Sequence, residues 1–169
     1  MRNEAFSVDL QAAEDISNEI INRDIRIAWA TTTRVDCVDE ELLTLMKKAG
    51  CYEIAYGIET ASQKLLDSLG KKTTVQKAKD AITATKQAGI KATALLIIGN
   101  RGETRSTICE TIDFLNEVKP DGLGSVGGLW ILPGTALYRK CKKDGIIDDS
   151  YWLTESEVPV YLEEHTKSE

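Results

Sequence analysis

The chain has 169 residues, of which 42% are hydrophobic and 28% are charged, with a formal net charge of −6 and an isoelectric point near 5.0. This composition predicts one globular domain with one core, and the acidic balance argues against a nucleic-acid-binding protein, which would need a broad basic surface. No apolar stretch approaches the roughly 20 residues that cross a bilayer, and no signal peptide opens the chain, so we expect a cytoplasmic location and no membrane partner.

The first third of the chain alternates between helical and strand patterns. A strand end could lie at 4–7, and residues 10–21 then show the apolar spacing of a helix. The β-branched and aromatic run 25–32 predicts a strand. Residues 39–49 predict a helix that begins with acids and that Gly50 ends. We therefore expect a strand followed by a helix to be the structural unit.

The same alternation continues to residue 143. The run 92–98 is apolar without alternation, which is typical of a strand buried on both faces of a parallel sheet. The expected elements are, in order, strand 52–58, helix 62–69, a turn at 70–72, helix 74–88, strand 92–98, helix 103–118, a strand within 123–131 and a helix that follows Pro133–Thr135 and ends at Lys143. This order predicts an α/β fold with a parallel sheet over residues 1–150, and 151–169 as a polar, acidic tail or linker.

Glu59 is the first candidate ligand-binding residue. It follows Gly57 and Ile58 at an expected strand end, where a carboxylate could accept hydrogen bonds from ribose hydroxyls or an ammonium group. Gly57 would let such a ligand approach the backbone. Glu59 could equally be the acidic residue that precedes a helix, with Thr60 or Ser62 as the cap. The spacing alone leaves both interpretations open.

Two further positions follow expected strand ends. The loop Gly99–Glu103 could seat a nucleotide moiety through its backbone, although it is neither a GxGxxG nor a P-loop motif, and it could also be a simple strand-to-helix turn. Arg34 could bind a carboxylate in a bidentate manner, either on a ligand or on Asp36. Both alternatives stay open for each position.

The sequence offers no metal-binding or histidine-based catalytic motif. Its four cysteines are Cys37, Cys51, Cys109 and Cys141, and none forms a CxxC pair, so we expect free thiols. The only histidine, His165, lies in the polar tail. The basic run 139–143 is expected to be a solvated helix end.

Taken together, these segments resemble the later half of the radical S-adenosylmethionine (radical SAM) barrel, especially the subgroup often joined to a cobalamin-binding domain. The resemblance is carried by five motifs in the order of the family. They are Asn3–Ser7 for "DDTFT", Trp29–Asp36 for "W…TRVD", Tyr56–Ser62 for "GIESGS", Ile98–Thr104 for "GLPGET" and Leu132–Tyr138 for "YPGTELY".

The resemblance implies part of a TIM-like (βα) barrel that holds S-adenosylmethionine beside a [4Fe–4S] cluster. By analogy with the family, Glu4 would meet the methionyl amine and Glu59 would lie near the ribose. Ile97 and Gly99 would contact adenine through apolar surface and backbone, and Arg34 could face the methionyl carboxylate.

The family holds its cluster with a CxxxCxxC motif, which this sequence lacks. We therefore expect the chain to be the C-terminal part of a radical SAM oxidoreductase barrel, with the cluster in the intact parent only, cobalamin possible in a separate domain, and no activity alone. The small-molecule substrate cannot be read from these motifs. One alternative is a cluster-free module that binds a nucleoside or S-adenosylmethionine. Another is a chain that self-associates through an exposed sheet edge.

Overall fold

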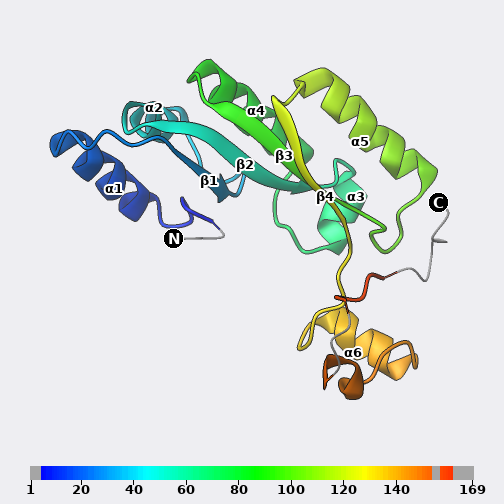
Figure 1. Ribbon diagram of the computed structural model, residues 1–169. Coiled ribbons are helices and arrows are strands. Elements are labelled where there is room, and N and C mark those ends of the chain that lie inside the picture. The colour runs from blue at the N-terminus through cyan, green and yellow to red at the C-terminus, as the bar shows by residue number, and fades with distance from the viewer. Residues whose placement is uncertain (1–4, 154–156, 162–169) are drawn as a thin grey trace.

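A parallel sheet forms the centre of the computed structural model, which describes residues 5–153 and 157–161 (Figure 1). Its four strands lie in the order β1-β2-β3-β4, and every neighbouring pair is parallel. The strands are β1 (Trp29–Thr33), β2 (Cys51–Glu59), β3 (Lys91–Ile98) and β4 (Gly122–Gly128). Helices connect successive strands, which confirms the expected α/β fold of (βα) repeats.

The helices begin and end near the predicted residues because the sequence places capping residues at their ends. Side chains of Asp39, Thr74 and Thr104 accept hydrogen bonds from the first turns of their helices. The elements are α1 (Leu10–Asn22), α2 (Glu40–Lys48), α3 (Gln63–Ser68), α4 (Val75–Gln87), α5 (Arg105–Val118), α6 (Ala136–Lys143) and a 3₁₀ helix, η1 (Asp149–Leu153). The basic run 139–143 lies in the last two turns of α6, as expected.

The main core lies between the sheet and one layer of helices. Figure 1 shows α2, α4 and α5 along the same side of the sheet. Alternate residues of β2 and β3 point into this layer and are buried, namely Ile54, Tyr56, Ile58, Ala92, Ala94 and Leu96. The residues between them, such as Gly57 and Ile97, therefore belong to the opposite side of the sheet, which we call the open face. In a closed barrel this face would be the interior.

The strand expected at 25–32 begins only at Trp29. Residues 25–28 connect α1 to the sheet, and Asp24 has a left-handed φ of 48° where the chain turns. The first ladder contact of β1 is the hydrogen bond from the Trp29 N–H to the Gly50 carbonyl, at 3.2 Å. Upstream of Trp29 there is no described strand partner, so β-propensity alone could not make this segment a strand.

A second hydrophobic cluster forms around α6, so the expectation of one core is wrong. Its buried residues are Ile131, Tyr138, Cys141, Ile147 and Tyr161, with Tyr151 and Trp152 packed against them. The chain leaves the sheet after β4, and α6 lies apart from the sheet in Figure 1. Tyr151, Trp152 and Tyr161, from the segment expected to be a tail or linker, therefore pack in this cluster, whereas Leu153 is exposed. A domain boundary at residue 150 stays a prediction.

The two outer strands of the sheet differ in their covering. The Phe6 N–H donates to the Thr32 carbonyl at 3.0 Å, and the hydroxyls of Ser7 and Thr33 are 2.7 Å apart, so residues 6–7 lie along β1. The edge strand β4 carries the exposed side chains of Leu123 and Val126. Self-association through a sheet edge stays a prediction. No helix in the described residues is long and apolar enough to cross a membrane.

Candidate ligand-binding site at the carboxyl ends of the strands

Glu59 lies at the carboxyl end of β2 and is paired with a lysine. Its Oε1 is 2.5 Å from Nζ of Lys71, which also lies 3.5 Å from the Gly57 carbonyl oxygen. Both side chains are largely covered, with 17% of Glu59 and 27% of Lys71 exposed. Glu59 has a φ of 63°, a conformation that costs a non-glycine residue about 1–2 kcal/mol. Such strain is frequent where a side chain must be aimed at a ligand.

Gly57 makes room for this ion pair. A Cβ atom at this position would lie 2.9 Å from Oε1 of Glu59 and 3.4 Å from Nζ of Lys71. The space that a side chain at position 57 would occupy is therefore filled by the paired charges on the open face. Gly57 admits Lys71 close to the backbone, in the way that we expected it to admit a ligand.

Arg34 forms the bidentate pair with Asp36 that the sequence left open. Its Nε and Nη2 donate to the two carboxylate oxygens at 2.9 and 2.8 Å, and Nη2 also lies 3.4 Å from the Lys71 carbonyl. The hydrogen bond from Arg34 holds the pKa of Asp36 below its usual value, against the opposing effect of burial. The carboxyl ends of β1 and β2 thus bring together two cations and two carboxylates, linked through Lys71. A zwitterionic ligand would bind there by replacing part of these internal pairs.

The loop after β3 is closed by its own hydrogen bonds. The Gly99 N–H donates to Oε2 of Glu103 at 2.6 Å, and Nδ2 of Asn100 donates to the Ile97 carbonyl at 2.8 Å. Asn100 is fully buried, and its Oδ1 has no partner among the described residues. The loop is therefore a strand-to-helix turn in which Glu103 precedes α5, whereas we expected Glu103 to begin that helix. A ligand at Gly99 could not use the Gly99 N–H, because Glu103 occupies it.

Ile97 lies beside Glu59 because of the sheet register. Glu59 pairs with Leu96, after an irregularity between Gly57 and Glu59. The structure therefore brings Glu59, Ile97 and Arg34 to one end of the sheet. Residues 157–161 approach the same end, since a Cβ atom on Gly99 would lie 3.7 Å from the Tyr161 carbonyl.

The remaining candidates of the sequence analysis are Glu4, His165 and the cysteines. Glu4 and His165 fall outside the described residues. The four cysteines are free, and no cluster of three or more metal-ligating side chains exists in the described part of the chain. Burial raises the pKa of the Cys51 thiol to about 11, as expected of an inert core thiol.

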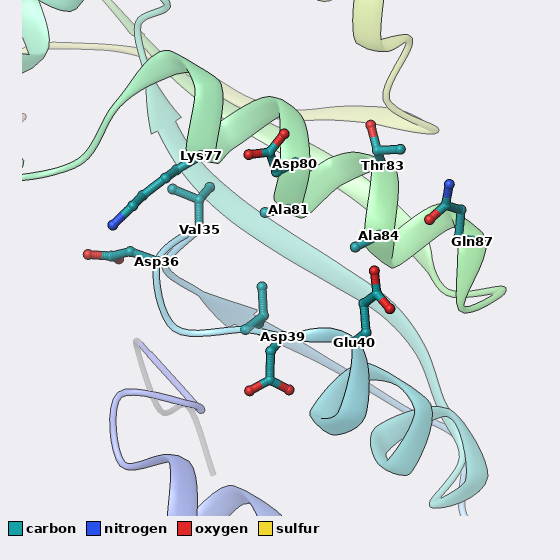
Figure 2. Close-up of a pocket in the computed structure, with 11 residues that line it drawn as sticks. Val35, Asp36, Asp39, Glu40, Lys77, Asp80, Ala81, Thr83, Ala84 and Gln87 are labelled. Carbon is teal, nitrogen blue, oxygen red and sulfur yellow. The ribbon is translucent and has the colours of Figure 1, made fainter.

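Figure 2 shows a groove that contains none of the predicted site residues. It runs between the start of α2 and α4, with a volume of about 570 Å³. Acidic side chains of Asp36, Asp39, Glu40 and Asp80 lie around it. It shares Asp36 with the candidate site, where Asp36 is paired with Arg34.

Lys71 is the site residue that sequence reasoning missed. We expected residues 70–72 only to form a turn, and the left-handed φ of Gly70 and Lys72 confirms that turn. The turn brings Lys71 back to Glu59, 12 residues earlier in the chain. No periodic pattern marks this contact, although a lysine in a short return loop after a strand-end carboxylate is a usable signal.

Comparisons with known proteins agree with this geometry. Residues 4–115 match the family model described as the radical SAM superfamily. An uncharacterized methyltransferase of Pyrococcus horikoshii is 30% identical over 168 residues, which is 99% of this chain and 36% of that protein. The anaerobic magnesium-protoporphyrin IX monomethyl ester cyclase of Rubrivivax gelatinosus is 38% identical over 109 residues, which is 63% of this chain and 20% of that protein. The chain thus spans about a third or less of each relative.

A solved structure shows the same fold. The radical S-adenosylmethionine methyltransferase TsrM of Kitasatospora setae, with cobalamin and a [4Fe–4S] cluster bound, superposes with a TM-score of 0.75 at 20% identity. The match covers 83% of this chain and 29% of that one. The family match covers well over half of the chain, and it includes β1, β2, β3 and most of α5. This chain belongs to the radical SAM superfamily.

Proposed function

We propose that this chain supplies the S-adenosylmethionine-binding part of a radical SAM enzyme that transfers a methyl group or closes a ring. The relatives named above are methyltransferases and a cyclase, whereas we had expected an oxidoreductase in broader terms. The observation that carries the proposal is the linked pair of ion pairs at the carboxyl ends of β1 and β2, inside the region that matches the family.

The residues present fit S-adenosylmethionine. The ligand carries a methionyl ammonium and carboxylate, a sulfonium, a ribose and an adenine. Glu59 would accept hydrogen bonds from the ribose hydroxyls, and Arg34 would face the carboxylate, each after exchanging part of its present partner. Ile97 would cover the adenine ring from the open face. The proposed contact of Glu4 with the methionyl amine extends this set.

Lys71 would hold Glu59 in place while the ligand enters. The ammonium fixes one carboxylate oxygen, which leaves the second oxygen to accept from a hydroxyl. Without this cation, the largely covered Glu59 carboxylate would have no ion-pair partner among the described residues and would attract water. The chain's own contribution is therefore to bind and orient the ligand and to exclude water from it.

The described residues do not fit a [4Fe–4S] cluster, because they contain no cluster of three cysteines. In the family the cluster supplies the electron that cleaves S-adenosylmethionine. We propose that another part of the intact protein holds it, so that the chain alone is inactive in that reaction. We also propose that a separate domain of the intact protein can bind cobalamin. The visible absorption spectrum of the intact protein would test for bound cobalamin.

The test is binding of S-adenosylmethionine to the intact, anaerobically reconstituted protein by equilibrium dialysis. Glu59→Gln should weaken binding about tenfold, because a hydrogen bond to a charged group contributes ~1.5–3 kcal/mol. Glu110→Gln removes one charge from an exposed position on α5 and is the matched control. Equal affinity of both variants would count against a role for Glu59, and no binding by any of the proteins would count against the proposed function.

A further inference from the structure

The guanidinium of Arg34, which we assign to the ligand carboxylate, is already paired with a carboxylate of the chain. Its Nε and Nη2 donate to the two oxygens of Asp36 at 2.9 and 2.8 Å. Arginine recognises a free carboxylate with the same planar, two-bonded geometry. In the free protein, Asp36 therefore occupies the donors that a ligand carboxylate would use.

The rest of the guanidinium offers a poorer place for a second carboxylate. Nη2 also lies 3.4 Å from the Lys71 carbonyl, so it is shared between two groups of the chain. Nη1 makes no hydrogen bond to a described residue. A ligand carboxylate at Nη1 would sit beside Asp36 on one cation, where two like charges repel each other. Two-bonded binding of the ligand therefore requires Asp36 to leave Arg34.

The exposure of this ion pair allows such an exchange. The side chains of Arg34 and Asp36 are 40% and 20% exposed, so water reaches both charges. Ion pairs that water reaches are weak, because solvent screens the attraction and competes for the hydrogen bonds. An incoming carboxylate can therefore replace Asp36, but the loss of the internal pair lowers the net affinity for the ligand.

A second cation lies close to the place where Asp36 would be released. Asp36 lines the groove of Figure 2, and Lys77 is the one basic side chain of that lining. The hydrogen bond from Arg34 is the main cause of the lowered pKa of Asp36, and the charge of Lys77 contributes to it to a smaller extent. Asp36 would therefore remain near a positive charge after the ligand takes Arg34.

We propose that Asp36 competes with the carboxylate of S-adenosylmethionine for Arg34, so that ligand binding must exchange an internal ion pair. This inference rests on the proposed function, and it adds a built-in limit on the affinity of that site. Asp36 acts on the ligand through Arg34 and is thus a positioning residue. Its removal should lower the stability of the fold and raise the affinity for the ligand, whereas a purely structural residue would not raise the affinity.

The test is the dissociation constant of S-adenosylmethionine for the intact, anaerobically reconstituted protein, by equilibrium dialysis without added reductant. Asp36→Asn should bind about two- to fivefold more tightly, which is the contribution of an ion pair that water reaches. Asp113→Asn makes the same change at an exposed position of α5 and should leave the constant unchanged. Decarboxylated S-adenosylmethionine should gain no affinity from Asp36→Asn, because it has no carboxylate to compete for Arg34.

Thermal melts would show that each variant is folded. If the parent binds and Asp36→Asn binds equally or more weakly, the inference is overturned and the proposed function stands. An equal gain for the decarboxylated compound overturns it as well, since the gain would not depend on the carboxylate. Absence of binding by the parent would overturn the proposed function, and the inference with it.

Discussion

Two glycine-to-alanine substitutions should have opposite consequences, although they make the same chemical change. Gly50 ends the turn after α2 with a φ of 91°, and an added Cβ atom would lie 2.0 Å from the Ile27 carbonyl oxygen. Relief of this clash would require a shift of the Ile27 backbone or a change in the left-handed conformation of residue 50, and either would move the start of β1. At Gly57 the nearest atoms are instead the ends of two flexible side chains, Glu59 and Lys71.

The magnitudes follow from these contacts. Gly50→Ala costs about 1–2 kcal/mol for the left-handed conformation and a similar amount for the backbone displacement, which amounts to roughly 3 kcal/mol. At about 2–4 °C per kcal/mol for a chain of this size, the melting temperature should fall by about 6–12 °C. Gly57→Ala should change stability by less than about 1 kcal/mol, since the lost ion pair is offset by the lower flexibility of the unfolded chain.

Thermal and urea denaturation of the two variants measure this difference directly, and binding of S-adenosylmethionine provides the second readout. We expect Gly50→Ala to lose stability, and we expect Gly57→Ala to retain stability but lose affinity, because Glu59 and Lys71 are pushed apart. Equal losses of stability in the two proteins would refute the reasoning. So would a Gly57→Ala protein that binds the ligand as the parent does.

Three further substitutions test a buried hydrogen bond of the main core and an ion pair of the site. The Thr85 hydroxyl donates to the Ala81 carbonyl at 2.7 Å, so the fully buried Tyr56 hydroxyl must donate to Thr85. Thr85→Val leaves the Tyr56 hydroxyl without an acceptor and should lower the free energy of unfolding by about 1–3 kcal/mol in urea denaturation. Tyr56→Phe removes the donor as well and should cost only ~0.5–1.5 kcal/mol. The reverse order would contradict the assigned direction of the hydrogen bond. Asp36→Asn should cost up to about 1 kcal/mol at pH 7, because Asp36 is bonded to Arg34. Since the folded-state pKa of Asp36 is lowered, this contribution is present above the unfolded pKa and is lost as the pH falls through the folded value, so the parent and variant should begin to converge below about pH 4. A difference that does not shrink as the pH falls below this value would rule out the ion pair as its source.

Much of the fold was predictable because local signals agree with the tertiary structure. The helices expected from Asp39 and from Thr74 begin one residue later, with these two residues as their caps, and Gly50 follows the first of them with a left-handed φ, as expected. The apolar run of β3 indicated a strand inside a parallel sheet, and the structure places it between β2 and β4. The expectation that both of its faces are buried is wrong for the open face, where Leu95 and Ile97 are only partly buried. These features depend on neighbours in the sequence, which is why they can be read without a structure.

The errors arose where distant contacts decide the structure. Residues 25–28 have strand-forming side chains but no partner strand, and only the sheet register reveals this. The cluster around α6 depends on Tyr161 returning to the chain near Ile131, where the Ile131 N–H donates to the Pro159 carbonyl at 2.8 Å. A composition-based expectation of a polar tail could not include that contact.

The sequence predicted where the candidate site lies, but it did not predict which side chains pair with one another there. Parallel-sheet geometry indicated that Arg34, Glu59 and Gly99 would meet at one edge, because strand carboxyl ends coincide. The identity of the partners was not readable, since Lys71 reaches Glu59 through a turn and Glu103 occupies the Gly99 N–H. The resemblance to radical SAM enzymes assigned roles to these positions, and those roles stay predictions.

The central claim is that the open face at the end of β2 binds S-adenosylmethionine through Glu59. Its most direct test is the dissociation constant of S-adenosylmethionine for the intact, reconstituted protein, measured in parallel for the parent, Glu59→Gln and Glu110→Gln. We predict about tenfold weaker binding for Glu59→Gln and an unchanged constant for Glu110→Gln. If all three proteins bind with the same constant, Glu59 does not contact the ligand and the site must lie elsewhere.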